Sequence, residues 1–117
     1  MTNEQVYAMP CAKVYYLLVN KATRKGRTEA EVQQIIRWMT GYSDAQLAEA
    51  LQNGTTYGDF FRNAPHIEPA CLLVKGSICG VRVETIEELP MRYIRILDKL
   101  VDELAKGRPM EKILRKV

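Results

Sequence analysis

One segment of the chain carries both the start of a helix and the apolar face that follows it. Thr28 and Glu31, in the sequence TEAE, form a capping box. In this motif the side chain of each residue accepts a hydrogen bond from the backbone amide of the other. Four apolar residues then recur at helical spacing: Val32, Ile35, Ile36 and Met39. Gly41 stops the pattern. The segment predicts an amphipathic helix over residues 28–40 with one buried face.

The rest of the chain divides in the same way into short helical pieces. Ser43 and Gln46 repeat the capping pattern and open a second helix, which Asn53 and Gly54 end. Prolines suited to first turns and glycines suited to helix ends predict further helices at about residues 12–25, 57–63, 90–106 and 109–114. The chain is therefore expected to be mainly α-helical, a compact single domain over residues 1–117 with five to seven short helices.

The longest apolar run, VYYLLV at residues 14–19, covers nearly the whole circumference of a helix. This pattern predicts a helix buried at the centre of the core, with a six-residue strand as the alternative. The run is far shorter than the roughly 20 residues that cross a bilayer. The N-terminal sequence has no basic region ahead of an apolar stretch, so no secretory signal is expected and the protein is predicted to be cytoplasmic.

Residues 71–83, CLLVKGSICGVRV, fit two structures. A small β-hairpin would place Gly76 and Ser77 in a two-residue turn. A helix beginning at Pro69 would instead let another backbone approach closely at Gly76 and Gly80, although two interior glycines each cost a helix about 1 kcal/mol. The helix is favoured because the surrounding segments are helical, and the hairpin stays open. In both structures Cys79 is expected to be a buried core thiol.

The residue types that catalysis or metal binding would need are sparse. Cys11, Cys71 and Cys79 show no C-x-x-C spacing, and His66 is the one histidine, so no disulfide framework, metal site or cofactor is expected. The glycine-rich phosphate-binding motifs and the G-x-S-x-G motif are missing as well. These observations disfavour an enzyme.

The charge pattern argues against a nucleic-acid partner. The net charge is only +3, and the basic cluster at 106–116 still contains Glu111. Helices 28–40 and 44–52 could form a helix-turn-helix, but the second reads DAQLAEALQ and has no basic residue to present to bases. Nucleic-acid binding through the clusters at 21–27 and 106–116 remains a weaker alternative, and it requires both to lie on one face.

Several stretches together resemble a known family. They are KGRTEAEVQQIIRWMTGY, FFRNAPHIEP, ICGVRVETIEELPMRYIRILDKLVDELAKG and MEKILRK. Their order, from about Tyr7 to Lys116, is similar to that of the small bacterial family known as domain of unknown function 2200. The resemblance implies a single-domain bacterial protein, and it carries over no catalytic residue, cofactor or partner.

Two functional hypotheses follow. The leading one is a non-catalytic interaction module that acts as a homo-oligomer, with Gly76 and Gly80 at the interface. The alternative is an enzyme or small-ligand-binding protein with a pocket formed by six polar, charged and aromatic side chains. These are Trp38, Tyr42, His66, Cys79, Arg82 and Glu84. The ligand that such a pocket would take is not specified by the sequence.

Overall fold

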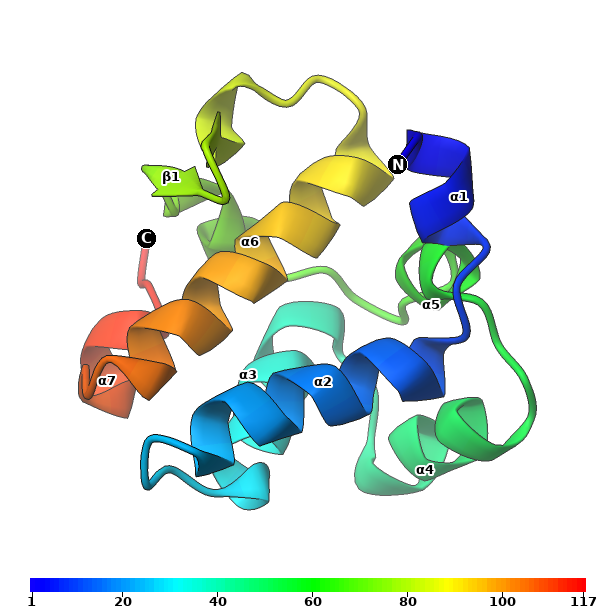
Figure 1. Ribbon diagram of the computed structural model, residues 1–117, viewed down its shortest axis with the longest axis horizontal. Coiled ribbons are helices and arrows are strands. Elements are labelled where there is room, and N and C mark those ends of the chain that lie inside the picture. Colours follow the sequence, from blue (N-terminus) through cyan, green and yellow to red (C-terminus); the bar gives the residue numbers. More distant parts are fainter.

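The computed structural model describes residues 1–117 and contains seven α-helices, two 3-10 helices and one hairpin (Figure 1). The α-helices are α1 (Asn3–Tyr7), α2 (Cys11–Thr23), α3 (Glu29–Thr40), α4 (Asp44–Gln52), α5 (Tyr57–Arg62), α6 (Leu89–Ala105) and α7 (Met110–Ile113). The 3-10 helices are η1 (Pro69–Leu73) and η2 (Val83–Thr85), and the strands are β1 (Ser77–Ile78) and β2 (Val81–Arg82). The mainly α-helical prediction is confirmed.

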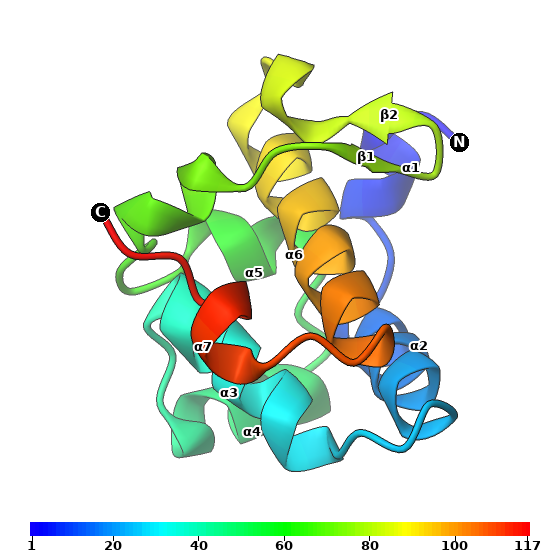
Figure 2. The ribbon, with the colours of Figure 1, turned by 90° about the vertical axis from the view of Figure 1, so that its left-hand side faces the viewer.

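Helix α6 is the element around which the others pack. It runs diagonally through the molecule and contacts α2, α3, α5, α7, β1 and both 3-10 helices (Figure 2). Its apolar stripe is buried along its whole length: Met91, Ile94, Leu97, Leu100, Val101 and Leu104. Because residues three and four apart share one side of a helix, this stripe presents a continuous surface to its neighbours.

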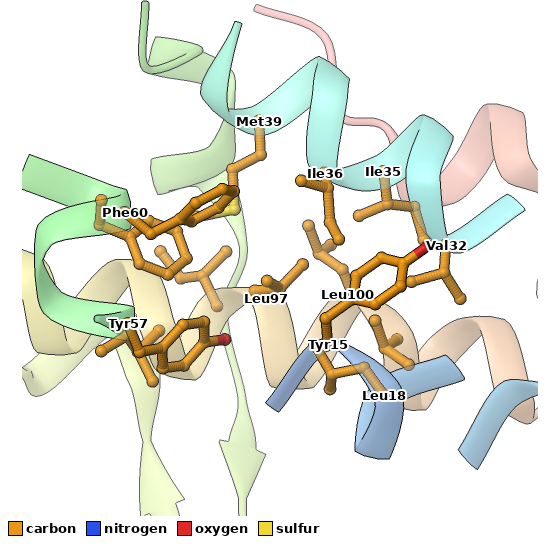
Figure 3. Close-up of a cluster of buried hydrophobic side chains, with 14 of the residues drawn as sticks. Tyr15, Leu18, Val32, Ile35, Ile36, Met39, Tyr57, Phe60, Leu97 and Leu100 are labelled. Carbon is orange, nitrogen blue, oxygen red and sulfur yellow. The ribbon is translucent and has the colours of Figure 1, made fainter. Parts of the chain in front are cut away.

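One hydrophobic core joins these elements. Figure 3 shows Tyr57 and Phe60 of α5 directed toward Leu97 of α6, with side chains of α2 and α3 further along the same helix. The predicted stripe of α3 is part of this core, since Val32, Ile35, Ile36 and Met39 are all at most 2% exposed. The short helix α1 is attached to the start of α6, where the Tyr7 hydroxyl donates to the Glu88 carboxylate.

The helix boundaries follow the caps read from the sequence. Thr28 accepts from the amide of Glu31 at the start of α3, and Ser43 accepts from the amide of Gln46 at the start of α4. Gly41 ends α3 in the left-handed conformation, with φ of +78°. Both predicted capping boxes are therefore confirmed. A third, Thr2 with Gln5, opens α1 and was not predicted.

The prediction for residues 14–19 is only partly right. The segment is helical, as part of α2, but α2 is not buried on all sides. Tyr16 is 56% exposed and Leu17 is 53% exposed, whereas Tyr15, Leu18 and Val19 are buried. The apolar run therefore has one side in the core and one side facing outward, because α3, α4 and α6 cover α2 from one direction.

The helix favoured for residues 71–83 is wrong, and the hairpin alternative is right. Ser77 pairs with Arg82 and Ile78 with Val81. The turn lies at Cys79 and Gly80, not at Gly76 and Ser77. Both turn residues have positive φ, 51° and 79°, as a type I′ turn requires.

The same hairpin corrects two further expectations. Cys79 is exposed at the tip of the turn and is not a core thiol. A Cβ placed on Gly80 would meet no atom within 4 Å, so the helical close approach inferred for this glycine does not occur within the chain. A role for Gly76 and Gly80 in an intermolecular interface stays a prediction. No helix of the protein is both long enough and apolar enough to span a membrane.

Candidate functional site

The six side chains predicted to form a pocket are divided between two regions. Cys79, Arg82 and Glu84 lie on or next to the hairpin, and the Arg82 guanidinium bonds the Glu84 carboxylate at 3.0 Å. The other three, Trp38, Tyr42 and His66, lie on α3 or close to its C-terminal end.

The second region has structural roles of its own. The Tyr42 hydroxyl donates to the Phe60 carbonyl at 2.6 Å, and the His66 amide donates to the Thr40 carbonyl at 3.0 Å. Trp38 packs half-buried against the core. Of the four cavities in the structure, none is lined by more than one of the six predicted side chains. Ligand binding by these residues stays a prediction.

Glu84 holds the base of the hairpin together. Its carboxylate accepts from the Gly76 amide at 2.9 Å and from the Arg82 guanidinium at 3.0 Å. The hydrogen bond from the Gly76 amide, followed by that from the amide of Glu84 itself and then by the hydrogen bond and charge of Arg82, lowers the pKa of Glu84 to about 2. The charged form of the Glu84 carboxylate is therefore the one that accepts these hydrogen bonds at the base of the hairpin.

This pKa gives a prediction for the pH dependence of the hairpin. Because the folded-state pKa is lowered, the contribution of Glu84 is complete above its ordinary pKa and is lost as the pH falls through about 2. A pH titration followed by NMR is expected to shift the Gly76 amide with a midpoint near this value. The Glu84→Gln variant should show no such transition. A Gly76 midpoint near 4 in the wild-type protein would contradict the assignment.

An apolar groove lies where α1, α2, α5 and α6 meet. It has a volume of about 230 Å³, and seven of its nine lining residues are hydrophobic. The lining residues are Met1, Val6, Met9, Val14, Leu17, Tyr57, Ile94, Arg95 and Asp98. None of them was among the predicted site residues.

A polar group without a partner lies in the wall of this groove. Tyr57 is 3% exposed, and its hydroxyl has no hydrogen-bond partner in the structure. Burial, reinforced by the nearby charge of Asp98, raises the pKa of this hydroxyl, so it is a donor at neutral pH. A buried donor left unpaired costs about 1–3 kcal/mol. The groove therefore offers an apolar lining and one unused hydrogen bond.

The charged pair in the groove is only partly accessible. The Arg95 guanidinium lies 3.5 Å from the Asp98 carboxylate, whose side chain is 24% exposed. Burial raises the pKa of Asp98, and the charges of Arg95 and Lys21 oppose this shift. These two side chains mark the polar edge of an otherwise apolar surface.

Two exposed apolar side chains are neighbours in the sequence of α2, and one of them also lines the groove. Tyr16 and Leu17 occupy the outer side of the helix, and Leu17 also lines the groove. Tyr16 is held edge-on against Tyr15, with ring centroids 5.1 Å apart. We call Tyr16, Leu17 and the groove together the α2 face. The apolar run at residues 14–19 was the one sequence signal for this face, and it was interpreted as core.

The two basic clusters meet on one side of the molecule. The Arg27 guanidinium donates to the carbonyls of Leu104 and Arg108, at 3.1 and 3.0 Å. Lys21 and Lys106 both bond the Asp102 carboxylate. The α2–α3 loop therefore lies beside the α6–α7 loop, as Figure 2 also shows.

The remaining candidate groups are protected. Burial raises the pKa of Cys11 to about 12 and the pKa of Cys71 to about 11, so both thiols are protonated at neutral pH. No group of three or more His, Cys, Asp or Glu side chains is arranged to hold a metal ion.

Comparisons with known proteins give a family and a fold. A family model described as an uncharacterized protein conserved in bacteria, DUF2200, matches residues 5–115. The chain is also similar to the crystal structure of "uncharacterized protein SP1917", with 43% sequence identity and a TM-score of 0.91. That similarity covers 97% of this chain and 93% of the other. None of the curated proteins matches.

Proposed function

We propose that this chain, which belongs to the bacterial DUF2200 family, is a non-catalytic interaction module that forms a homodimer through its α2 face. The observation that carries the proposal is the exposure of Tyr16 and Leu17, each more than half accessible, within the apolar run at residues 14–19, which covers nearly the whole circumference of the helix. A helical segment that is apolar around its circumference is normally buried on all sides. We therefore expect the exposed side of α2 to be buried against a second protein surface.

A second copy of the chain suits this face better than an unrelated partner. In a two-fold symmetric interface, one patch must carry both the protrusion and the recess that receives it. The α2 face has both, because the Tyr16 side chain lies exposed on the same helix whose Val14 and Leu17 line the groove. We place Tyr16 of each copy in the groove of the other.

This arrangement also gives the Tyr57 hydroxyl a partner. A tyrosine side chain that enters the groove brings an apolar ring and one polar atom, which match the apolar lining and the unused donor. The bond would remove the cost of a buried unpaired group, so dimer formation would gain both apolar burial and one hydrogen bond. We place the dimer in the bacterial cytoplasm, a compartment that suits three cysteines without a disulfide.

Sedimentation velocity over a concentration series tests the proposal. The wild-type chain is expected to sediment as a dimer at micromolar concentration. Leu17→Asp is expected to weaken the dimer at least about 10-fold, because it replaces apolar contact with a charge that must lose water. Leu73→Asp is the matched control, since Leu73 is 47% exposed on η1 and lies outside the α2 face.

The position of Tyr57 provides a second readout. Tyr57→Phe removes only the hydroxyl, so it is expected to weaken the dimer while the monomer keeps or gains stability. A wild-type chain that stays monomeric at several hundred micromolar would overturn the proposal. Equal effects of Leu17→Asp and Leu73→Asp would overturn the assignment of the interface to the α2 face.

A further inference from the structure

The joined basic clusters form a second surface, separate from the α2 face. Residues 21–27 and 99–116 together carry ten basic and three acidic side chains, whereas the whole chain has a net charge of only +3. The positive charge of the protein is thus concentrated on the α2–α3 loop and on the segment from the end of α6 through α7. We call these two segments the basic face.

Two of the three acidic side chains of this region are paired with basic side chains of the same region. Asp102 bonds Lys21 and Lys106 and has a side chain only 17% exposed. Glu103 is 10% exposed at its side chain and bonds Arg108 and Arg115. Each carboxylate is shared by two cations, so a positive charge remains at each pair. The mixed-charge argument drawn from the sequence rested on Glu111, which is exposed and forms no ion pair, so Glu111 stays as the one free acidic side chain of this region.

Several cations of the basic face have no acidic partner. Arg24, Lys25 and Lys112 are exposed, and none of them forms an ion pair. Lys112 also lines an open cleft of about 500 Å³ that has no hydrophobic lining residue. Its lining residues are Lys99, Glu103, Lys106, Gly107, Arg108, Pro109 and Lys112.

We propose that the basic face binds the phosphate backbone of a nucleic acid without reading its bases. The unpaired cations are spread over the α2–α3 loop and helix α7, which suits a row of phosphates better than one small anion. Lysine and arginine contacts to phosphate set affinity and position but carry no sequence information. The second helix of the α3–α4 pair remains without a basic residue, so the contact does not use a recognition helix.

Fluorescence anisotropy with two unrelated duplexes of about 20 base pairs tests the proposal. The affinity is expected to be equal for both and to fall roughly 30- to 100-fold between 50 and 200 mM salt, as three or so phosphate contacts require. Lys25→Glu and Lys112→Glu should each weaken binding several-fold and reduce the salt slope by about 1.

Arg62→Glu is the control for net charge, because Arg62 is exposed on α5, outside the basic face. It changes the total charge by the same amount and is expected to leave the affinity within about 2-fold. Equal loss in all three variants would overturn the proposal, as would salt-independent binding. Complete competition by low-millimolar pyrophosphate would instead assign the cleft to a small phosphate compound. Leu17→Asp should leave binding by each subunit intact, which separates this test from that of the dimer.

Discussion

Gly41→Ala is expected to lower the free energy of unfolding by about 2–4 kcal/mol. Gly41 has a φ of +78°, where an alanine is strained by about 1–2 kcal/mol. The added Cβ would also lie 2.9 Å from both the amide nitrogen and the carbonyl oxygen of His66. These atoms belong to the backbone, and the same His66 amide bonds the Thr40 carbonyl, so they cannot move aside at low cost.

Gly54→Ala is the matched control for this prediction. Gly54 has nearly the same backbone conformation, with a φ of +80°, but no atom lies within 4 Å of its added Cβ. Its substitution should cost only the conformational strain of about 1–2 kcal/mol. Urea denaturation of both variants measures the difference. Equal losses would show that the approach of the His66 backbone contributes nothing to stability.

The second large effect is expected at the centre of the core. Leu100→Ala should lower the free energy of unfolding by about 2–5 kcal/mol, because it removes apolar contact and leaves a cavity that the neighbours fill only in part. Leu100 is completely buried and lies among side chains of α2 and α3 (Figure 3). Urea denaturation measures this loss. The slope of the free energy of unfolding against urea concentration is expected to stay unchanged.

Leu73→Ala is the control for this substitution. Leu73 is 47% exposed, so the same chemical change should alter stability by no more than about 0.5 kcal/mol. A comparable loss of unfolding free energy in the two variants would mean that the contribution of Leu100 to stability does not depend on its burial. A small loss for Leu100→Ala would indicate that the surrounding helices collapse into the space.

Most helices were predictable because their signals are local. A capping box, a left-handed glycine and an apolar stripe involve residues within a few positions of one another, so Thr28, Gly41 and the α3 stripe could be identified without a tertiary structure. The hairpin was harder. Its turn places Cys79 at positive φ, a conformation that non-glycine residues adopt only rarely, and the surrounding helices biased the prediction toward a helix.

The candidate surfaces were less predictable than the fold. The six predicted site residues were chosen by chemical type, and the fold divides them between the hairpin and the end of α3. Tyr57 carries no sequence signal for its unpaired hydroxyl, because pairing depends on which atoms surround it after folding. The meeting of the basic clusters depends likewise on contacts between residues nearly 80 positions apart, such as Arg27 with Leu104.

The sequence by itself determined where helices start and stop, which of their faces are apolar, and the family to which the chain belongs. The tertiary structure alone decided which apolar side of α2 stays uncovered, which polar group stays unpaired, and which charges share a face. The physical reason is that secondary structure arises from interactions a few residues apart along the chain. Exposure, pairing and the clustering of charge arise from the packing of distant segments.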